Sequence, residues 1–408
     1  MKERIIFLAA AVLSALFLTS CSTGPSASGS SELSSSAQGT SIITTSAGTE
    51  ASTPTTESSA TEPAQTSTGA DTTYETRAKE ILQGMSLEEK VGQMFFVRCP
   101  ETDAVTAVST WHPGGYILFG RDFDGKTVQQ VIDQNAAYQS ASSIPMLIGV
   151  DEEGGTVVRI SQYNQFRPEK FKSPQSLFAA GGLDLIKSDT DEKADFLLHV
   201  GVNVNLAPVC DVSTSPDDFI YARSFGMPAE DTAAYVSAVT QEMVSHRIGC
   251  VLKHFPGYGN NVDTHTGIAF DNRSYDTFVT SDFLPFTAGI DAGAGAIMVA
   301  HNVVACMDAK LPASLSLPVH EILRKDLGFT GVIMTDDLDM DAIKDYTGGK
   351  EAAVLAVEGG NDMLVSTDFE TQIPAVLAAV NSGEIAKANI DASVLRILVW
   401  KLSLGIIS

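Results

Sequence analysis

The chain has few cysteines and few basic residues for its length. Only five cysteines occur among 408 residues, and the four beyond residue 21 are isolated within apolar stretches, as small core residues are. Lysine and arginine number 26 against 50 acidic residues, which gives a formal net charge of −24. A chain this acidic is repelled by polyanions, so nucleic acid is not an expected partner.

The sequence also lacks the glycine spacing of a nucleotide-binding loop. The glycines in residues 151–155 (DEEGG) and 114–115 match turns, but not the G-x-G-x-x-G or P-loop patterns that hold phosphate groups. No closely spaced cysteines or histidines provide the ligand cluster of a zinc site. We therefore expect an activity that uses neither a metal nor an organic cofactor.

The first residues have the pattern of an export signal. Basic residues precede the apolar run 5–17, which is shorter than the roughly 20 residues of a transmembrane helix. Leu18-Thr19-Ser20-Cys21 then resembles a lipoprotein cleavage box. We expect residues 1–20 to be a signal peptide and Cys21 to carry acyl chains. The protein would then be extracytoplasmic and anchored to the cell membrane by its lipid.

Residues 21–73 are rich in serine, threonine, alanine, glycine and proline. Their apolar content is too low to offset the entropy of ordering, which predicts a disordered tether. The remaining residues, 74–408, are apolar enough for one large α/β domain. We expect this domain to begin with a helix capped by Ser86 and Glu89, which have capping-box spacing.

Eight apolar segments separated by helix-length stretches predict the strands of the domain. They span residues 93–99, 115–120, 146–151, 203–209, 249–255, 296–301, 331–336 and 362–366. Continuous apolar runs indicate strands buried on both faces, and intervening helices indicate parallel connections. Eight such units predict a (β/α)8 TIM barrel, with an open doubly wound sheet as the alternative.

Polar side chains stand where several of these strands end. They are Asp151, Asp211, Lys253 with His254, His301, and Asp336. In a barrel the carboxyl ends of the strands converge on one mouth, so these groups are expected to share a site.

Aspartate and histidine at such a mouth suit hydrolysis of a glycosidic bond. Asp336 ends a rigid strand and is the expected nucleophile. The neighbouring Asp337 is expected to point away and cap the next helix, because side chains alternate along a strand. His265 is the expected proton donor, with Asp263 orienting its ring.

Other polar residues are candidates for binding sugar. Lys253, His254 and Asp151 can hydrogen-bond hydroxyl groups, while Arg159 and Arg223 offer forked donors for an acetamido oxygen or a carboxylate. His301 is nearly as well explained by a structural role as by a substrate contact.

Residues 253–259 (KHFPGYG) with Asp263-Thr264-His265 resemble the signature K-H-F-P-G-H-G…D-S-H of bacterial β-N-acetylglucosaminidases in glycoside hydrolase family 3. The resemblance extends over residues 115–119, 150–155 with Arg159, 201–212, 223–226, 298–301 and 335–340. Two departures are Tyr258, where histidine is usual, and residues 260–262, one residue shorter than usual.

The resemblance implies a retaining exo-hydrolase that removes terminal β-linked N-acetylglucosamine through a covalent glycosyl-enzyme. It implies that Asp336 is the nucleophile and that Asp263 and His265 form a mobile acid/base dyad. The positions that match sugar ligands are Asp151, Arg159, Arg223, Lys253 and His254. The implied partner is a carbohydrate, from peptidoglycan fragments or chito-oligosaccharides, and the implied process is peptidoglycan turnover or scavenging.

Three alternatives stay open. A β-glucosidase of the same family often takes its acid/base carboxylate from a domain after the barrel, whereas the residues that follow position 366 suffice here for a closing helix. A phosphorylase is conceivable because a histidine repels phosphate less than a carboxylate does. A glycan-binding lipoprotein without catalysis is disfavoured by the presence of Asp336, Asp263 and His265.

Overall fold

The computed structural model describes residues 69–261, 267–340, 343, 346–347 and 351–408. The expected signal peptide, the lipidated Cys21 and nearly all of the expected tether lie outside these residues. Helix α1 (Gly69–Gln83) begins before the domain boundary expected at residue 73. In the described part of the chain, no helix combines the length and the apolar character of a membrane span.

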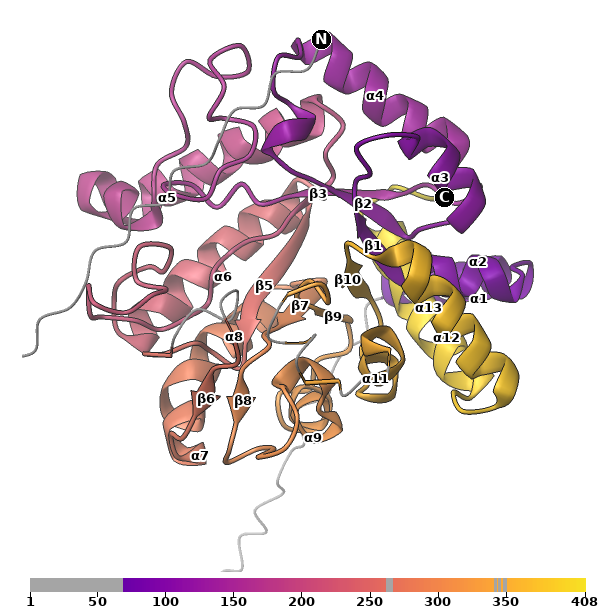
Figure 1. Ribbon diagram of the computed structural model, residues 1–408. Helices are drawn as coiled ribbons and strands as arrows, with labels where there is room; N and C mark the ends of the chain where they lie inside the picture. The colour runs from indigo at the N-terminus through magenta and orange to yellow at the C-terminus, as the bar shows by residue number, and fades with distance from the viewer. Residues whose placement is uncertain (1–68, 262–266, 341–342, 344–345, 348–350) are drawn as a thin grey trace, which may run out of the picture. The chain divides into compact units, whose positions relative to one another are not determined.

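Eight parallel strands form the centre of the fold (Figure 1). They are β1 (Phe95–Arg98), β2 (Gly115–Leu118), β3 (Leu147–Val150), β4 (Val204–Asn205), β5 (Gly249–Phe255), β7 (Ala296–Val299), β9 (Val332–Thr335) and β10 (Leu364–Ser366). Their order is β10-β1-β2-β3-β4-β5-β7-β9, and a parallel bridge between Met334 and Met363 joins the two ends. Each strand lies within a segment predicted from the sequence, which confirms the (β/α)8 barrel.

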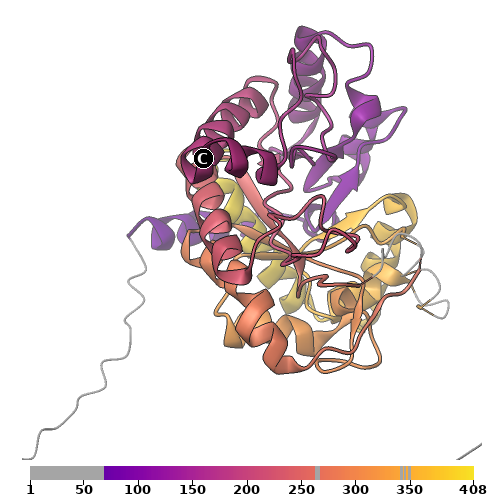
Figure 2. The same cartoon turned by 90° about the vertical axis from the view of Figure 1, so that its left-hand side faces the viewer.

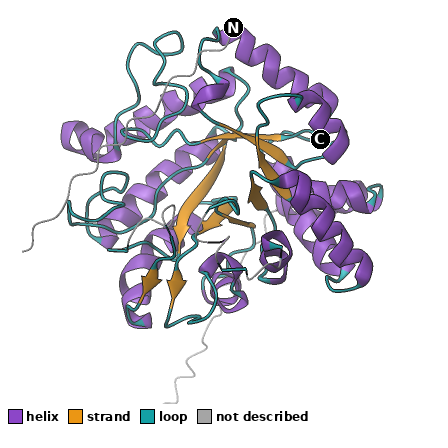
Figure 3. Ribbon diagram, viewed as in Figure 1, coloured by secondary structure: helices purple, strands orange, loops and turns teal. Residues whose placement is uncertain are grey.

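Helices surround the strands on the outside (Figure 3). Between β1 and β5 they are α3 (Ala104–Trp111), η1 (Gly120–Asp122), α4 (Val128–Ala141), α5 (Pro174–His199) and α6 (Ala229–Ser245). Between β5 and β9 they are α7 (Tyr275–Thr277), η3 (Phe278–Asp282), α8 (Phe283–Asp291), η4 (Ala313–Leu315), α9 (Leu317–Glu321) and η5 (Ile322–Asp326). The last described helices are α11 (Ala352–Glu358), α12 (Phe369–Ser382) and α13 (Lys387–Ser403).

The N-terminal helices follow the local sequence rules. Ser86 caps α2 (Leu87–Gln93) by accepting from the Glu89 backbone, and the Glu89 side chain accepts from the Ser86 backbone, so the predicted capping box is confirmed. Helix α1 packs against the C-terminal helix α13. In Figure 2 the indigo α1 lies on one side of the barrel, and the orange and amber loops lie on the other.

A small second sheet was not predicted. Strands β6 (Phe270–Asp271) and β8 (Val303–Val304) pair in parallel, with Phe270 opposite Val303. Two-residue strands show no periodicity in a sequence, so only the tertiary fold defines them.

Candidate active site

A pocket of about 440 Å³ opens at the carboxyl ends of the barrel strands. Its volume lies in the range of small-molecule sites. The six described candidates for catalysis or sugar binding line it: Asp151, Arg159, Arg223, Lys253, His254 and Asp336, whereas Asp211 and His301, also expected at this mouth, do not. The other two candidates, Asp263 and His265, lie outside the described residues.

Lys253, near the end of β5, is held by two carboxylates. Its Nζ lies 2.7 Å from Asp151 Oδ1 and 2.7 Å from Glu153 Oε1, and its side chain is only 2% exposed. Burial alone would lower the pKa of Lys253, but Asp151 and Glu153 outweigh burial and raise it. Lys253 is therefore a fixed positive charge at the floor of the pocket.

Glu153 also holds Arg223, through two hydrogen bonds. Arg223 Nε donates to Oε2 at 3.1 Å, and Nη2 donates to Oε1 at 2.8 Å. Burial would raise the pKa of Glu153, but Lys253 and Arg223 hold it well below its usual value. Such a bidentate pair fixes the plane of the guanidinium. The sequence analysis did not single out Glu153, which stands in the expected turn 151–155, although an acid two residues after the predicted strand 146–151 was a usable signal.

His254 is oriented by Asp211, which lies after β4. The distance from His254 Nδ1 to Asp211 Oδ2 is 2.7 Å, and the Tyr258 backbone donates to Asp211 Oδ1 at 2.8 Å. The other ring nitrogen, Nε2, lies 3.2 Å from Arg223 Nη2. Both polar residues predicted for the end of β5 are thus anchored by acids predicted for other strands.

Glu152 shapes the loop that carries Arg159. Its buried carboxylate accepts from the backbone of Arg159 and of Ile160, each at 2.8 Å. Gly154 is required in this loop because its φ is +100° and a Cβ there would lie 2.3 Å from the Lys172 carbonyl oxygen. As a result Arg159 Nη2 reaches Asp151 Oδ2 at 3.3 Å.

Asp336 follows β9 and stays attached to the sheet. Its backbone donates to Val299 O at 3.1 Å, and its Oδ1 accepts from the Asp337 backbone at 2.8 Å. Asp337 lines the pocket too, but its carboxylate accepts from Thr367 Oγ1 at 2.6 Å and from the Asp339 backbone at 3.0 Å. Burial raises the pKa of Asp337. The two neighbouring acids therefore have different surroundings.

His301 has a supporting position. It is fully buried, its Nδ1 lies 2.7 Å from Ser314 Oγ, and its Nε2 lies 3.0 Å from the Asp337 carbonyl oxygen. Both ring nitrogens are thus engaged with the protein, so the structural alternative left open by the sequence describes it better.

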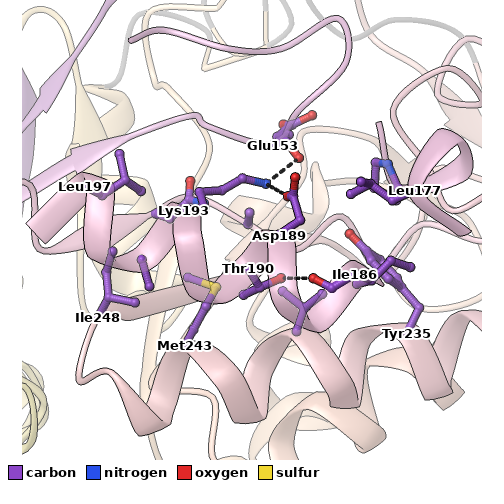
Figure 4. A pocket seen from close by; sticks show the side chains of 15 residues that line it. Glu153, Leu177, Ile186, Asp189, Thr190, Lys193, Leu197, Tyr235, Met243 and Ile248 are labelled. Atoms are coloured by element: carbon purple, nitrogen blue, oxygen red, sulfur yellow. Dashed lines mark hydrogen bonds and ion pairs between the residues drawn. The ribbon is translucent and has the colours of Figure 1, made fainter. Parts of the chain in front are cut away.

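A second, much smaller cavity lies behind Glu153, between α5 and α6 (Figure 4). Lys193 enters it, 3.2 Å from Asp189 and 3.4 Å from the Glu153 carbonyl oxygen. The cavity measures about 20 Å³. It has room for about one water molecule, so it supports the site from behind and does not hold a sugar.

The described part of the chain from residue 69 on, with its gaps at 262–266, 341–342, 344–345 and 348–350, contains no group of three or more His, Cys, Asp or Glu arranged as a metal site. The pocket instead combines charge pairs, hydrogen-bond donors and an aspartate on a rigid strand end.

Barrel and site together define an enzyme of the (β/α)8 class that acts at the carboxyl ends of its strands. The sequence of residues 86–399 matches the protein-family model of the glycosyl hydrolase family 3 N-terminal domain. The chain therefore belongs to glycosyl hydrolase family 3.

Curated relatives agree with this assignment. A beta-hexosaminidase of Xanthomonas campestris pv. campestris is 32% identical over 295 residues, which cover 71% of this chain and 86% of the relative. The beta-hexosaminidase LpqI of Mycobacterium tuberculosis is 29% identical over 330 residues, which cover 78% and 83%.

Solved structures share the fold. A family 3 β-N-acetylglucosaminidase from Paenibacillus sp. str. FPU-7 superposes with a TM-score of 0.73 at 31% identity, covering 79% of this chain and 63% of that chain. The beta-glucoside phosphorylase BglX superposes with a TM-score of 0.72 at 23% identity, a likeness of fold alone.

Proposed function

We propose that this protein is a retaining exo-β-N-acetylhexosaminidase that removes terminal β-linked N-acetylglucosamine from peptidoglycan fragments or chito-oligosaccharides. The observation that carries the proposal is the position of Asp336, on a strand end in the same pocket as the Asp151, Lys253, His254 and Arg223 array. The relatives named beta-hexosaminidase support the choice of sugar.

Substrate binding uses the fixed polar groups of the pocket. Lys253 is held in place by Asp151 and Glu153, which leave one of its three ammonium N–H groups for a sugar hydroxyl at little cost in side-chain entropy. His254 is fixed by Asp211, and its Nε2 contacts a sugar hydroxyl in exchange for its contact with Arg223. Arg223, fixed by Glu153, is assigned to the side of the ring that carries the acetamido group.

The first chemical step forms a glycosyl-enzyme. An Asp336 carboxylate oxygen attacks the anomeric carbon while the bond to the glycosidic oxygen breaks, and the departing oxygen takes a proton from His265, whose ring Asp263 orients. A water molecule then gives a proton to His265 and attacks the same carbon, which releases Asp336. Two inversions retain the β configuration.

The test uses Asp336→Ala. This variant is expected to abolish release of a phenol from an aryl β-N-acetylglucosaminide, and activity at the wild-type level would refute the nucleophile assignment. Proton NMR of the first product formed should show the β anomer. Predominant α anomer would contradict a retaining mechanism.

The acid/base dyad is tested with two leaving groups. His265→Ala is expected to lose far less activity on an aryl glycoside of low leaving-group pKa than on a disaccharide, because a good leaving group needs little protonation. Equal losses on both substrates would contradict the proposed acid role.

The same assays distinguish the remaining alternatives. An aryl β-glucoside preferred over the N-acetylglucosaminide would indicate a β-glucosidase, and a sugar phosphate formed only with inorganic phosphate present would indicate a phosphorylase. Binding of chito-oligosaccharides without turnover of any substrate would indicate a non-catalytic lipoprotein.

We also infer that Cys21 is lipidated and that the enzyme works outside the cytoplasm, attached to the cell membrane. The lipobox pattern ending at Cys21 supports this proposal. Cys21→Ala should move the protein from the membrane fraction to the soluble fraction, and an unchanged distribution would contradict the anchor.

A further inference from the structure

Two arginines approach one aromatic ring inside the pocket. Arg98 ends β1 and Phe119 follows β2, so adjacent parallel strands bring them to the same rim. The guanidinium carbon of Arg98 lies 4.4 Å from the centroid of the Phe119 ring, and that of Arg159 lies 5.5 Å from it. All three residues line the pocket that contains Asp336. Two positive charges therefore share one wall.

The charges of these arginines are incompletely compensated. Arg159 donates to Asp151, which also accepts from Lys253. The guanidinium of Arg98 stacks on the Phe119 ring, and this is its side-chain contact among the described residues. The Nε atoms of both arginines are buried and have no hydrogen-bond partner in the described part of the chain. A buried cationic N–H without an acceptor is unfavourable, so this wall favours an anion that arrives with the substrate.

The acids around the pocket leave this preference intact. Asp336, Asp337 and Asp339 line the pocket from the segment after β9, and strand β10 separates β9 from β1 in the sheet. Burial raises the pKa of Asp122, and Arg98 is among the cations that oppose this rise. The Asp122 carboxylate accepts from the Phe119 backbone at 2.8 Å, and Asp122 does not line the pocket. The acid beside Arg159 is Asp151, which Arg159 shares with Lys253, whereas the three acids after β9 come from a segment that β10 separates from β1 in the sheet.

We propose that Arg98, together with Arg159, binds a carboxylate of the saccharide substrate and selects acidic over neutral glycans. This inference rests on the proposed function. A guanidinium offers a carboxylate two parallel hydrogen bonds, which a sugar hydroxyl cannot match in charge or geometry. The carboxylate has two possible sources. One is a lactyl ether on the departing sugar, as in N-acetylmuramic acid, and the other is a uronic group on the non-reducing sugar.

The test compares wild type with Arg98→Gln on matched substrates. These are N-acetylglucosaminyl-β-1,4-N-acetylmuramic acid, chitobiose, which lacks the lactyl group, and the aryl glycosides of N-acetylglucosamine and of its 6-carboxylate. The variant is expected to lower kcat/KM on a carboxylate substrate by about ten- to a hundredfold, the size of a lost charged hydrogen bond, and on neutral substrates by less than about threefold. A selective loss on the disaccharide supports the lactyl source, and a selective loss on the 6-carboxylate glycoside supports the uronic source.

Lys126→Gln is the matched control. Lys126 also influences Asp122, but it donates to Gln134 and does not line the pocket, so all four activities should match wild type. Arg98→Lys keeps the positive charge but cannot form two parallel hydrogen bonds to a carboxylate, so its preference for acidic substrates should lie between those of Arg98→Gln and wild type. The wild-type preference for the acidic substrate should also shrink as salt is added.

Three results would overturn the proposal. Equal losses of Arg98→Gln on acidic and neutral substrates would assign Arg98 to pocket shape alone. A phosphate-dependent product that disappears in Arg98→Gln would assign the wall to inorganic phosphate. The third result comes from calorimetry, which measures the binding of free N-acetylmuramic acid and of N-acetylglucosaminuronic acid without turnover. If wild type and Arg98→Gln bind both sugars with equal affinity, Arg98 does not bind a carboxylate. A wild type inactive on every substrate would instead refute the proposed function.

Discussion

Glu153 is the residue whose removal should affect both the stability and the activity of this enzyme. It is buried and is paired with Lys253 at 2.7 Å and with Arg223 at 2.8 Å. Glu153→Gln keeps the shape of the side chain and removes the negative charge between two buried cations. Breaking a buried ion pair by removing one partner costs about 3–5 kcal/mol, so we expect a loss of unfolding free energy of about 3 kcal/mol or more.

The assay is urea unfolding at neutral pH together with kcat/KM on an aryl N-acetylglucosaminide. Activity should fall as well, because Lys253 and Arg223 lose the group that fixes their positions. Glu192→Gln provides the control, since Glu192 pairs with Arg167 at a similar 2.9 Å but is 57% exposed. An exposed pair contributes at most about 1 kcal/mol, so this variant should behave almost as wild type.

The pH dependence gives an independent check. The pKa of Glu153 is lowered in the fold, so its stabilising contribution is fully present above its ordinary pKa of 4.5 and is lost as the pH falls below that value towards the folded pKa. The stability difference between wild type and Glu153→Gln should therefore narrow in acid. A variant equal to wild type in unfolding free energy and in kcat/KM at neutral pH would refute this account of the site.

Two further predictions concern the rest of the barrel. Lys401 in α13 is buried and donates to Gln93 at 2.7 Å, and burial lowers its pKa from 10.5 to about 7. Between these two pH values the unfolded chain binds more protons than the folded chain, so the unfolding free energy should rise as the pH increases from about 7 towards 10.5. Urea unfolding at several pH values measures this rise, and the Lys401→Met variant should not show it. Cys306 is exposed, whereas Cys99, Cys210 and Cys250 are buried. In a chain with Cys21→Ser, a thiol reagent should label one site rapidly and Cys306→Ser should abolish that labelling, while rapid labelling that survives would contradict the burial of the other three.

Local sequence determined much of the architecture. The apolar runs around β1 to β10 were recognisable because strands buried on both faces need continuous hydrophobic side chains, and the Ser86 capping box depends on residues only three positions apart. Strand-end residues such as Asp151 and Lys253 were identifiable as site candidates because parallel strands in a barrel end at one mouth.

Tertiary structure alone decided how those groups are paired and charged. Glu153 was read as part of a turn, yet it holds Arg223, 70 positions away in sequence, and Lys253. Arg98 ends an apolar strand, but its significance comes from Phe119 and Arg159, which lie in the segments after β2 and β3. A sequence shows which side chains can carry charge, but the partners and the burial that set their energies come from contacts between residues far apart in the chain.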